Sequence, residues 1–358
     1  MYRGPLRMLI RTDASPKRGL GHLTRCLALA LEFRARGWQV YFCVDTGGYP
    51  LPALLRRNGF VATALRFKSP RRVGGEDLRQ VLKLGERLRA KAVLVDSYSI
   101  TPAYLRQLTA SGHFVIRLDD LARQPAPAHV IINGNIGAER LRYRCPPGTL
   151  VLAGNRFALI RPEIRVLRER FGHPPIRWRA SRVLICLGGS DPSGQSLRVL
   201  RWLDMVPGEF SVNVLVTSYF HRLDEFRQLA RSRKRSVRIH CEPRNVGCVM
   251  RGCDFAVTAA GITSYELACL GVPFLVWKLY PNQQYAHKYL AGRGVALNAG
   301  QRGRHAAPFF VNQFRRLMNS RSLRRQLQRR AFLAFDGRGP ERVVRTVTRT
   351  FRAQRAEE

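Results

Sequence analysis

Short apolar runs alternate with longer amphipathic segments along the first half of the chain. Runs of strand length predict strands over 7–13, 39–45, 92–98, 113–120, 129–135 and 150–154. Apolar positions at helical spacing predict helices over 22–37 and 75–91, and Gly37 is placed to end the first of them. Regular alternation of strand and helix is typical of α/β layers built on a parallel sheet.

The same pattern begins again after residue 181. The segment RVLICLGGSDP repeats the opening in which a strand is followed by glycines, and further strands are predicted over 210–218, 237–243, 255–261 and 273–279. Helices are predicted to begin near 261 and 282, and a last helix to cover 339–354. We therefore predict an α/β protein with two Rossmann-like, doubly wound domains that face each other across a cleft, with ligands at the carboxyl ends of the strands.

The domain limits follow from length and from one proline-rich stretch. A chain of 358 residues is long for a single core, so two domains are expected. We predict an N-terminal domain over 1–171, a linker over 172–181, a C-terminal domain over 182–335 and a C-terminal helix over 336–358.

Composition excludes several classes of protein. A hydrophobic content of 45% excludes a disordered chain, and no apolar run approaches the roughly 18 residues that a membrane span needs. The first residues lack the pattern of a signal peptide, so a cytoplasmic protein is expected. The 8 cysteines form no CxxC pair, and most lie in apolar segments. Cys241, Cys248, Cys253 and His240 lack the paired spacing of zinc ligands, so no metal is predicted.

The charge is unusual, because 62 basic residues outnumber 24 acidic ones and give a formal net charge of +38. Such a balance suggests a nucleic-acid partner. The basic residues are nearly all arginines spread over the whole length, however, and no nucleic-acid-binding motif accompanies them. We therefore predict no specific nucleic-acid partner, and attraction to an anionic substrate or peripheral contact with an anionic membrane stays open.

The first candidate ligand-binding segment is CLGGSDPSGQS, residues 186–196. Gly188 and Gly189 stand between a predicted strand and a helix, where glycine lets the backbone approach a ligand and the helix N-terminus offers N–H groups to an anion. Ser190 supplies a hydroxyl for a phosphate, and Asp191 is placed to cap the helix. An ordinary tight turn between strand and helix explains the glycines equally well.

A second glycine turn lies in TAAGITSYELACLGVP, residues 258–273. Gly261 follows a strand, and Thr263 and Ser264 offer hydroxyls at a helix start. Glu266 lies in the first turn, where a carboxylate can hold both hydroxyls of a ribose. The alternative for Glu266 is a capping-box partner of Thr263, three residues earlier.

Three amides follow in YPNQQYAH, residues 280–287. Asn282, Gln283 and Gln284 can hydrogen-bond a base or a sugar, and the alternative is a helix capped by Asn282. Near the N-terminus, His22 ends a GLGH turn and begins an apolar run. Taken alone, that position favours a polar residue at a helix start over a catalytic base.

Several segments together resemble one family. RTDAS, GLGHLTRCLALA, VLVDSY, LDDLA, GNRFALIRPEI, ICLGGSDP, AAGITSYELACLGVPFLV and NQQYAH follow one another in this order. They resemble the PseG family of UDP-2,4-diacetamido-2,4,6-trideoxy-β-L-altropyranose hydrolases, to which spore-coat polysaccharide proteins are related. The resemblance runs over about 8–348. It implies a GT-B fold like that of MurG, a UDP-sugar substrate and a role in nonulosonic (pseudaminic) acid or surface polysaccharide biosynthesis.

The resemblance also implies roles for single residues. His22 matches the histidine that activates water, Asp13 is placed to orient the imidazole or contact the sugar, and Tyr98 matches a tyrosine near the sugar. Ser97 stands where the family usually has histidine, so the sugar itself is left open. The residues assigned to substrate or UDP, the latter mainly in the C-terminal domain, are Gly21, Arg25, Gly188, Gly189, Ser190, Gly261, Thr263, Ser264, Glu266, Asn282 and Gln283.

The implied reaction is hydrolysis by a monomer. Water activated by His22 attacks the anomeric carbon while UDP leaves, and backbone N–H groups of the two glycine turns offset the charge of the leaving group. No cofactor is implied, nor a metal, since Asp119 and Asp120 are adjacent and form no DxD pair. Two alternatives stay open: a GT-B glycosyltransferase that moves the sugar of a UDP-sugar donor to a sugar or lipid acceptor, and a binding module without catalysis.

Overall fold

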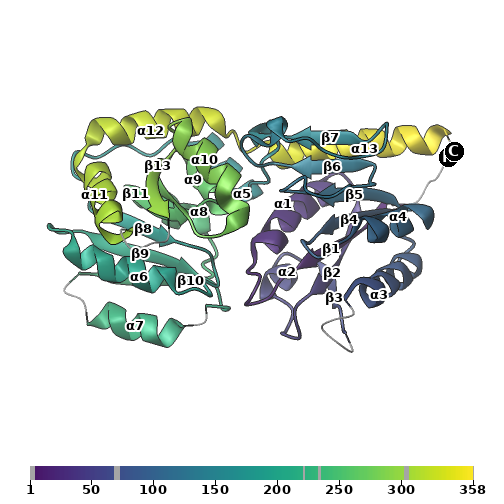
Figure 1. The fold of residues 1–358 in the computed structure, drawn as a ribbon, viewed down its shortest axis with the longest axis horizontal. Coiled ribbons are helices and arrows are strands. Elements are labelled where there is room, and N and C mark those ends of the chain that lie inside the picture. The colour runs from purple at the N-terminus through teal and green to yellow at the C-terminus, as the bar shows by residue number, and fades with distance from the viewer. Residues whose placement is uncertain (1–4, 68–72, 221, 233–234, 302–305, 358) are drawn as a thin grey trace. The chain divides into compact units, whose positions relative to one another are not determined.

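The chain folds into two units in a computed structural model that describes residues 5–67, 73–220, 222–232, 235–301 and 306–357. Unit 1 consists of the chain up to Leu159 together with the segment from Arg338 onward, and unit 2 runs from Ile160 to Gly337. Each unit contains one parallel sheet with helices on both faces (Figure 1). No described helix combines the length and the apolar character that crossing a bilayer requires.

The sheet of unit 1 has seven strands in the order β3-β2-β1-β4-β5-β6-β7. They are β1 (Arg7–Asp13), β2 (Gln39–Asp45), β3 (Val61–Ala64), β4 (Ala92–Asp96), β5 (Phe114–Leu118), β6 (Val130–Asn133) and β7 (Leu150–Ala153). The chain moves outward from β1 to β3 and then returns to place β4 on the other side of β1. In doubly wound sheets, ligands bind at the carboxyl ends of the two strands that flank such a reversal.

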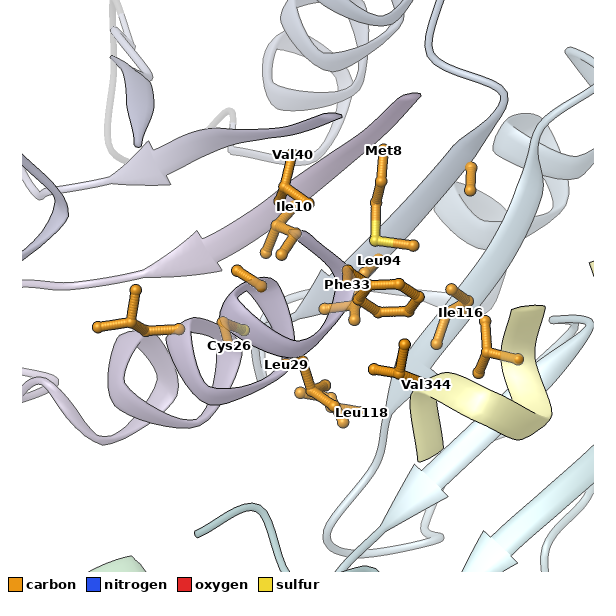
Figure 2. Packing of buried hydrophobic residues seen from close by; sticks show 14 of the residues in the cluster. Met8, Ile10, Cys26, Leu29, Phe33, Val40, Leu94, Ile116, Leu118 and Val344 are labelled. Carbon is orange, nitrogen blue, oxygen red and sulfur yellow. The ribbon is translucent and has the colours of Figure 1, made fainter. Parts of the chain in front are cut away.

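Helices cover both faces of this sheet. They are α1 (Gly21–Ala35), α2 (Ala53–Arg57), α3 (Val73–Arg87), α4 (Pro102–Ala110) and α13 (Gly339–Glu357). Figure 2 shows the core on one face, where Phe33 of α1 and Val344 of α13 lie with Ile10, Leu94 and Ile116 of three neighbouring strands. A second core on the opposite face is formed with α3 and α4. Helix α13 therefore completes the core of unit 1 although it lies far from it in sequence.

Unit 2 has six parallel strands in the order β10-β9-β8-β11-β12-β13. The strands are β8 (Arg182–Cys186), β9 (Ser211–Val216), β10 (Val237–Cys241), β11 (Phe255–Ala259), β12 (Phe274–Lys278) and β13 (Leu297–Gln301). The helices are α5 (Pro162–Phe171), α6 (Gln195–Trp202), α7 (Leu223–Arg231), α8 (Val246–Arg251), α9 (Ile262–Leu270), α10 (Gln284–Gly292), α11 (Ala306–Asn319) and α12 (Arg321–Ala334). Its topology repeats the reversal of unit 1, here between β8 and β11.

The predicted strands and their parallel arrangement are confirmed, and β1 and β2 have the predicted limits. The sequence missed the short edge strand β3 and the strand β13, whose small and polar residues give weak apolar runs. The cysteines contain no disulfide, and Cys241 and Cys248 are exposed rather than buried. These two residues stand at the end of the edge strand β10 and on the short helix α8.

The units divide at different residues from those expected from the proline-rich stretch. The chain passes from unit 1 to unit 2 at Leu159–Ile160, ahead of α5, whereas the linker was expected over 172–181. Helix α5 buries Ile164 and packs against α8 and α9 of unit 2, so residues 162–171 belong with the second sheet. Helix α13 belongs to unit 1 because its valines fill the core beside α1.

Candidate active site

His22 lies at the start of α1, directly after the loop that follows β1. The N-cap position of α1 is Leu20 and no side chain caps the helix, so the imidazole does not serve as a cap. His22 is 8% exposed, and its Nδ1 lies 2.7 Å from Oδ1 of Asp96. Asp96 ends β4, the strand beside β1, so the topological reversal brings the two residues together.

Arg25 lies one turn further along α1, on the same face as His22. Its Nε and Nη2 donate to the two oxygens of Asp96 at 2.7 and 2.6 Å. Its Nη1 donates to both oxygens of Asp120 at 2.7 and 2.8 Å. One guanidinium thus holds two carboxylates, of which one ends β4 and the other follows β5.

Tyr98 completes this cluster. Its hydroxyl donates to Oδ2 of Asp120 at 2.7 Å, and its ring stands edge-on to the imidazole of His22 with 4.8 Å between ring centroids. We call His22, Arg25, Asp96, Tyr98 and Asp120 the His22 network. Arg25 of the same helix and three side chains at or after the ends of β4 and β5 therefore fix the position of one imidazole.

The network sets the protonation of its carboxylates. Burial by itself raises the pKa of Asp96, but attraction to Arg25 and then to His22 outweighs burial and holds that pKa well below its ordinary value. The pKa of Asp120 is lowered by Arg25 in the same way, against the effect of burial. Two groups lie near Nδ1 of His22, Oδ1 of Asp96 at 2.7 Å and Nη2 of Arg25 at 3.2 Å. The ionised carboxylate is the closer of the two and only accepts hydrogen bonds, so we assign the proton to Nδ1, and in a neutral imidazole the lone pair is then on Nε2.

Asp13 lies in a different cluster of unit 1. Arg11 binds it, and Nη1 of Arg18 lies 2.8 Å from Oδ2 of Asp13 and 2.7 Å from Oδ2 of Asp45. Within the described residues, none of its ion pairs or hydrogen bonds reaches His22. The carboxylate that orients the imidazole is therefore that of Asp96, and of the two roles expected for Asp13 only contact with the sugar is left.

In unit 2, the first glycine turn follows β8. Gly188 has a φ of +105°, which only glycine adopts without strain, and a Cβ at Gly189 would overlap the side chain of Thr217. The carboxylate of Asp191 accepts from the backbone N–H groups of Gln195 and Ser196 at 2.9 and 2.6 Å. The N-cap residue of α6 is Gly194 and not Asp191, but the Asp191 carboxylate occupies these two N–H groups, which are consequently not available to an anion.

The second glycine turn leads into α9. Glu266 is 1% exposed, and Arg161 binds both of its oxygens, Nε to Oε1 at 2.6 Å and Nη2 to Oε2 at 2.8 Å. Because α9 begins at Ile262 after Gly261, Thr263 lies inside the helix, and the capping-box alternative is wrong. The hydroxyl of Ser264 donates to the carbonyl of Gly261 at 2.5 Å, which closes the turn.

Two of the three amides after β12 lie in a tight turn. Oε1 of Gln283 accepts from the backbone N–H groups of Leu279 and Tyr280 at 3.0 and 3.3 Å, so this amide shapes the turn. Gln283 itself is the N-cap residue of α10, and capping of that helix by Asn282 is wrong. Ser190 lies in the glycine turn after β8, and Thr263 lies at the start of α9 after β11. The two hydroxyls therefore follow the two strands that flank the reversal in the sheet of unit 2.

Three residues of these clusters were not assigned a role from sequence. Asp96, Asp120 and Arg161 all lie in the segments VLVDSY, LDDLA and GNRFALIRPEI that carried the family resemblance. A carboxylate at the end of a buried strand beside the reversal was a usable signal for Asp96. Among the described residues, no three histidine, cysteine, aspartate or glutamate side chains are gathered as ligands of a metal ion.

No protein-family model matches the chain. It is 24% identical over 288 residues to an uncharacterized protein of Methanocaldococcus jannaschii, covering 78% of this chain and 56% of that protein. It is 28% identical over 217 residues to the spore coat polysaccharide biosynthesis protein SpsG of Bacillus subtilis, covering 60% and 62%. The chain thus spans about three fifths of the length of these two relatives. It is 22% identical over 293 residues to the UDP-2,4-diacetamido-2,4,6-trideoxy-β-L-altropyranose hydrolase of Campylobacter jejuni, covering 81% and 97%.

Solved structures share the whole fold. MurG of Acinetobacter baumannii, 16% identical, superposes with a TM-score of 0.63 over 97% of this chain and 100% of its own. The rhamnosyltransferase SpnG, 17% identical, gives 0.64 over 96% and 100%. The chain has the GT-B fold with two Rossmann-like units. Within that class it is a distant homologue of the altropyranose hydrolase and of SpsG, in line with the resemblance of its motifs.

Proposed function

We propose that this protein hydrolyses a UDP-linked deoxy-diacetamido sugar and releases UDP and the free sugar. The reaction would serve nonulosonic (pseudaminic) acid or surface polysaccharide biosynthesis. The observation that carries the proposal is the 2.7 Å hydrogen bond between Nδ1 of His22 and Asp96, which leaves the lone pair of Nε2 to act as a base. Distant homology to a hydrolase of this class supports the choice of reaction.

The proposed step moves one proton and exchanges one bond. Nε2 of His22 takes a proton from water as the water oxygen bonds to the anomeric carbon of the sugar. The bond from that carbon to the UDP oxygen breaks, and its electron pair leaves with UDP. Asp96 then faces an imidazolium and stabilises it, which is the role of a carboxylate behind a catalytic histidine.

The other members of the His22 network act through the imidazole or on the sugar. Arg25 keeps Asp96 ionised and in place, so it is a positioning residue. Tyr98 is 49% exposed, and we assign its ring a place beside the sugar together with Gly21 and Asp13. Ser97 stands where the related family has histidine, so the stereochemistry of the sugar is the part of the substrate that this proposal leaves open.

We assign the nucleotide to unit 2. A carboxylate offers about four lone-pair positions, and Arg161 uses two of those of Glu266. The other two are sufficient for the two hydroxyls of a ribose, with Arg161 as the group that holds the carboxylate in position. The remaining residues that we assign to UDP are those of the two glycine turns and the amide turn, namely Gly188, Gly189, Ser190, Gly261, Thr263, Ser264, Asn282 and Gln283.

Release of UDP in the absence of any acceptor tests the proposal. We expect turnover of a UDP-diacetamido-sugar in buffer alone, with ¹⁸O from labelled water found at C1 of the sugar and not in UDP. His22→Ala should lower the rate by at least about 10²-fold, the scale of one general base. His240→Ala in unit 2, which removes a histidine bonded to Asn213, is the matched control and should keep full activity. UDP release that requires an added sugar or lipid would establish a glycosyltransferase instead, and UDP binding without turnover a binding module.

A further inference from the structure

Arg117 on β5 is a buried guanidinium without a partner. It is 8% exposed and forms no hydrogen bond or ion pair with any residue that the structure describes, and its Nη1 is completely buried. Burial therefore lowers its pKa against the pull of Asp119 and Asp96. A buried charge without a partner costs several kcal/mol by order of magnitude. Such a cost points to a group that Arg117 meets only when substrate is bound.

Arg11 is a second buried arginine of the same sheet, and its guanidinium has carboxylate partners. Arg11 pairs in register with Val95 of β4, and Val95 pairs with Arg117, so the two arginines lie in one row on one face of the sheet. Arg11 is fully buried and its Nη2 lies 2.5 Å from Asp77. Burial in this layer is thus compatible with an arginine when a carboxylate meets it, and Arg117 lacks that carboxylate.

Asn133 at the end of β6 supplies a second donor without an acceptor. It is 1% exposed, and its buried Nδ2 has no hydrogen-bond partner among the described residues. Its Oδ1 accepts from the backbone N–H and from Nδ2 of Asn135 at 3.2 and 2.9 Å, which fixes the amide with its NH₂ away from Asn135. Tyr143 donates its hydroxyl proton to the carbonyl of Ala138 at 3.1 Å, and the nearby Asn133 amide opposes the rise that burial causes in the pKa of this phenol.

The two donors share a face and an edge of the sheet. Arg117 pairs with Ile131, and Asn133 follows two positions later, so its side chain is on the same face and closer to the carboxyl end. The charges around Arg117 are those of Asp96, Asp119 and Asp120 against Arg25. Three carboxylates with two guanidinium groups leave an excess of one negative charge, which opposes a further anion.

A neutral oxygen that only accepts hydrogen bonds fits these two donors. A carbonyl oxygen has two lone pairs and no proton of its own to satisfy, whereas a hydroxyl brings a proton that needs an acceptor. Each of the three nearby carboxylates already accepts hydrogen bonds: Arg25 donates to Asp96 and Asp120, and the backbone N–H groups of Leu121 and Ala122 donate to Oδ1 of Asp119. The occupant is therefore expected to be the carbonyl of an amide.

We propose that Arg117 and Asn133 bind the carbonyl oxygen of an N-acyl substituent on the sugar and thereby select N-acylated sugars over their hydroxyl counterparts. The inference rests on the proposed function, because it places the sugar beside the His22 network, at the carboxyl edge that β4 shares with β5 and β6. A site built to hydrogen-bond one substrate group discriminates strongly against the analogue that lacks it, since its buried donors are then left without a partner.

The first test measures selectivity in binding. Dissociation constants are measured by calorimetry for UDP and for two matched pairs, UDP-N-acetylglucosamine with UDP-glucose and UDP-N-acetylgalactosamine with UDP-galactose. In at least one pair the wild type should bind the N-acetyl sugar about tenfold or more tightly, in proportion to one charge-assisted hydrogen bond. Arg117→Met and Asn133→Leu should each reduce that preference to less than about threefold and leave the affinity for UDP unchanged. Arg106→Met, at an exposed position of α4, is the matched control and should keep the preference.

The second test measures stability without ligand. Arg117→Met removes a buried charge that makes no hydrogen bond or ion pair among the described residues, so this variant should lose much less melting temperature than Arg11→Met. Arg11→Met removes a paired one and should melt well below the wild type. An Arg117→Met protein that melts as low as Arg11→Met, or that keeps the N-acyl preference, overturns the inference. A wild type that binds UDP-sugars without this preference overturns the inference alone, whereas a wild type that binds neither these sugars nor UDP overturns the proposed function with it.

Discussion

The Nδ1 atom of His22 lies 2.7 Å from Oδ1 of Asp96, although 74 positions separate the two residues in the chain. The contact exists because β1 and β4 are neighbours, so the helix that follows β1 starts beside the residue that ends β4. The carboxylate fixes both the orientation of the ring and the nitrogen that carries the proton. A histidine at a helix start thereby acquires the geometry of a general base.

Asp96→Asn should lower kcat by about 10³- to 10⁴-fold, with a much smaller change in KM. The amide can donate to Nδ1, which places the proton on Nε2 and removes the lone pair that accepts a proton from water. The pH–rate profile should change as well, because the imidazolium loses the charge that stabilises it. Asp119→Asn is the matched control, since the side chain of Asp119 accepts from the backbone of a turn and makes no hydrogen bond or ion pair with His22 among the described residues. Wild-type kcat in Asp96→Asn would show that His22 is not the base.

Tyr98→Phe should lower kcat/KM by about tenfold, the scale of one hydrogen bond to a charged group. It removes the hydroxyl that donates to Asp120 and keeps the ring that packs against His22. Tyr98→Ala removes both and should cost substantially more. Kinetics of the two variants at saturating and low substrate separate the effects on kcat and KM, and equal losses in both would assign the function of Tyr98 to its hydroxyl.

Glu266→Gln should weaken the preference for UDP over 2′-deoxy-UDP. The wild type is expected to bind UDP about tenfold more tightly, as one hydrogen bond from a ribose hydroxyl to a carboxylate is worth roughly 1.5 kcal/mol or more. Calorimetric titration of both nucleotides checks this expectation. Asp224→Asn, on an exposed stretch of α7, is the control. A preference unchanged in Glu266→Gln would make the Arg161–Glu266 pair purely structural.

The His22 network should also be visible in acid unfolding. The pKa of Asp96 is lower in the folded protein than in the unfolded chain, so its stabilisation is fully present above the unfolded value near 4 and is lost as the pH falls below it. Asp96→Asn should thus lower the free energy of unfolding by up to about 3 kcal/mol at pH 7. The difference from the wild type should shrink below about pH 4. Urea titrations at pH 7, 5 and 3 measure it, and a difference independent of pH would contradict the assigned charge.

Much of the fold could be predicted from the sequence because buried parallel strands give continuous apolar runs. The weak runs of β3 and β13 were missed for the same reason, since edge strands need fewer apolar residues. The candidate base was predicted correctly in position, as a residue at the start of α1. The His22→Ala and Asp96→Asn variants test its role as the base.

The partner of His22 could not be predicted, because Asp13 and Asp96 both end buried strands that lie side by side. In the structure Arg11 and Arg18 bind Asp13, and Asp96 is the carboxylate that contacts His22. Neither contact of Asp13 can be deduced from sequence spacing alone. The pairing of Arg161 with Glu266 spans 105 positions and depends on α5 packing against α9. Long-range ion pairs of this kind are set by tertiary packing, which local patterns do not contain.

Helix α13 determines the order in which the chain can fold during its synthesis. Unit 2 is continuous from Ile160 to Gly337, so its core needs no residue of α13. Unit 1 begins earlier in the chain but completes its core last, because three fully buried valines of α13 are part of the packing around α1. They are Val343, Val344 and Val347. The unit that carries His22 can therefore complete its core only once α13 is present, and a chain that stops before α13 would contain all of unit 2 and an incomplete unit 1.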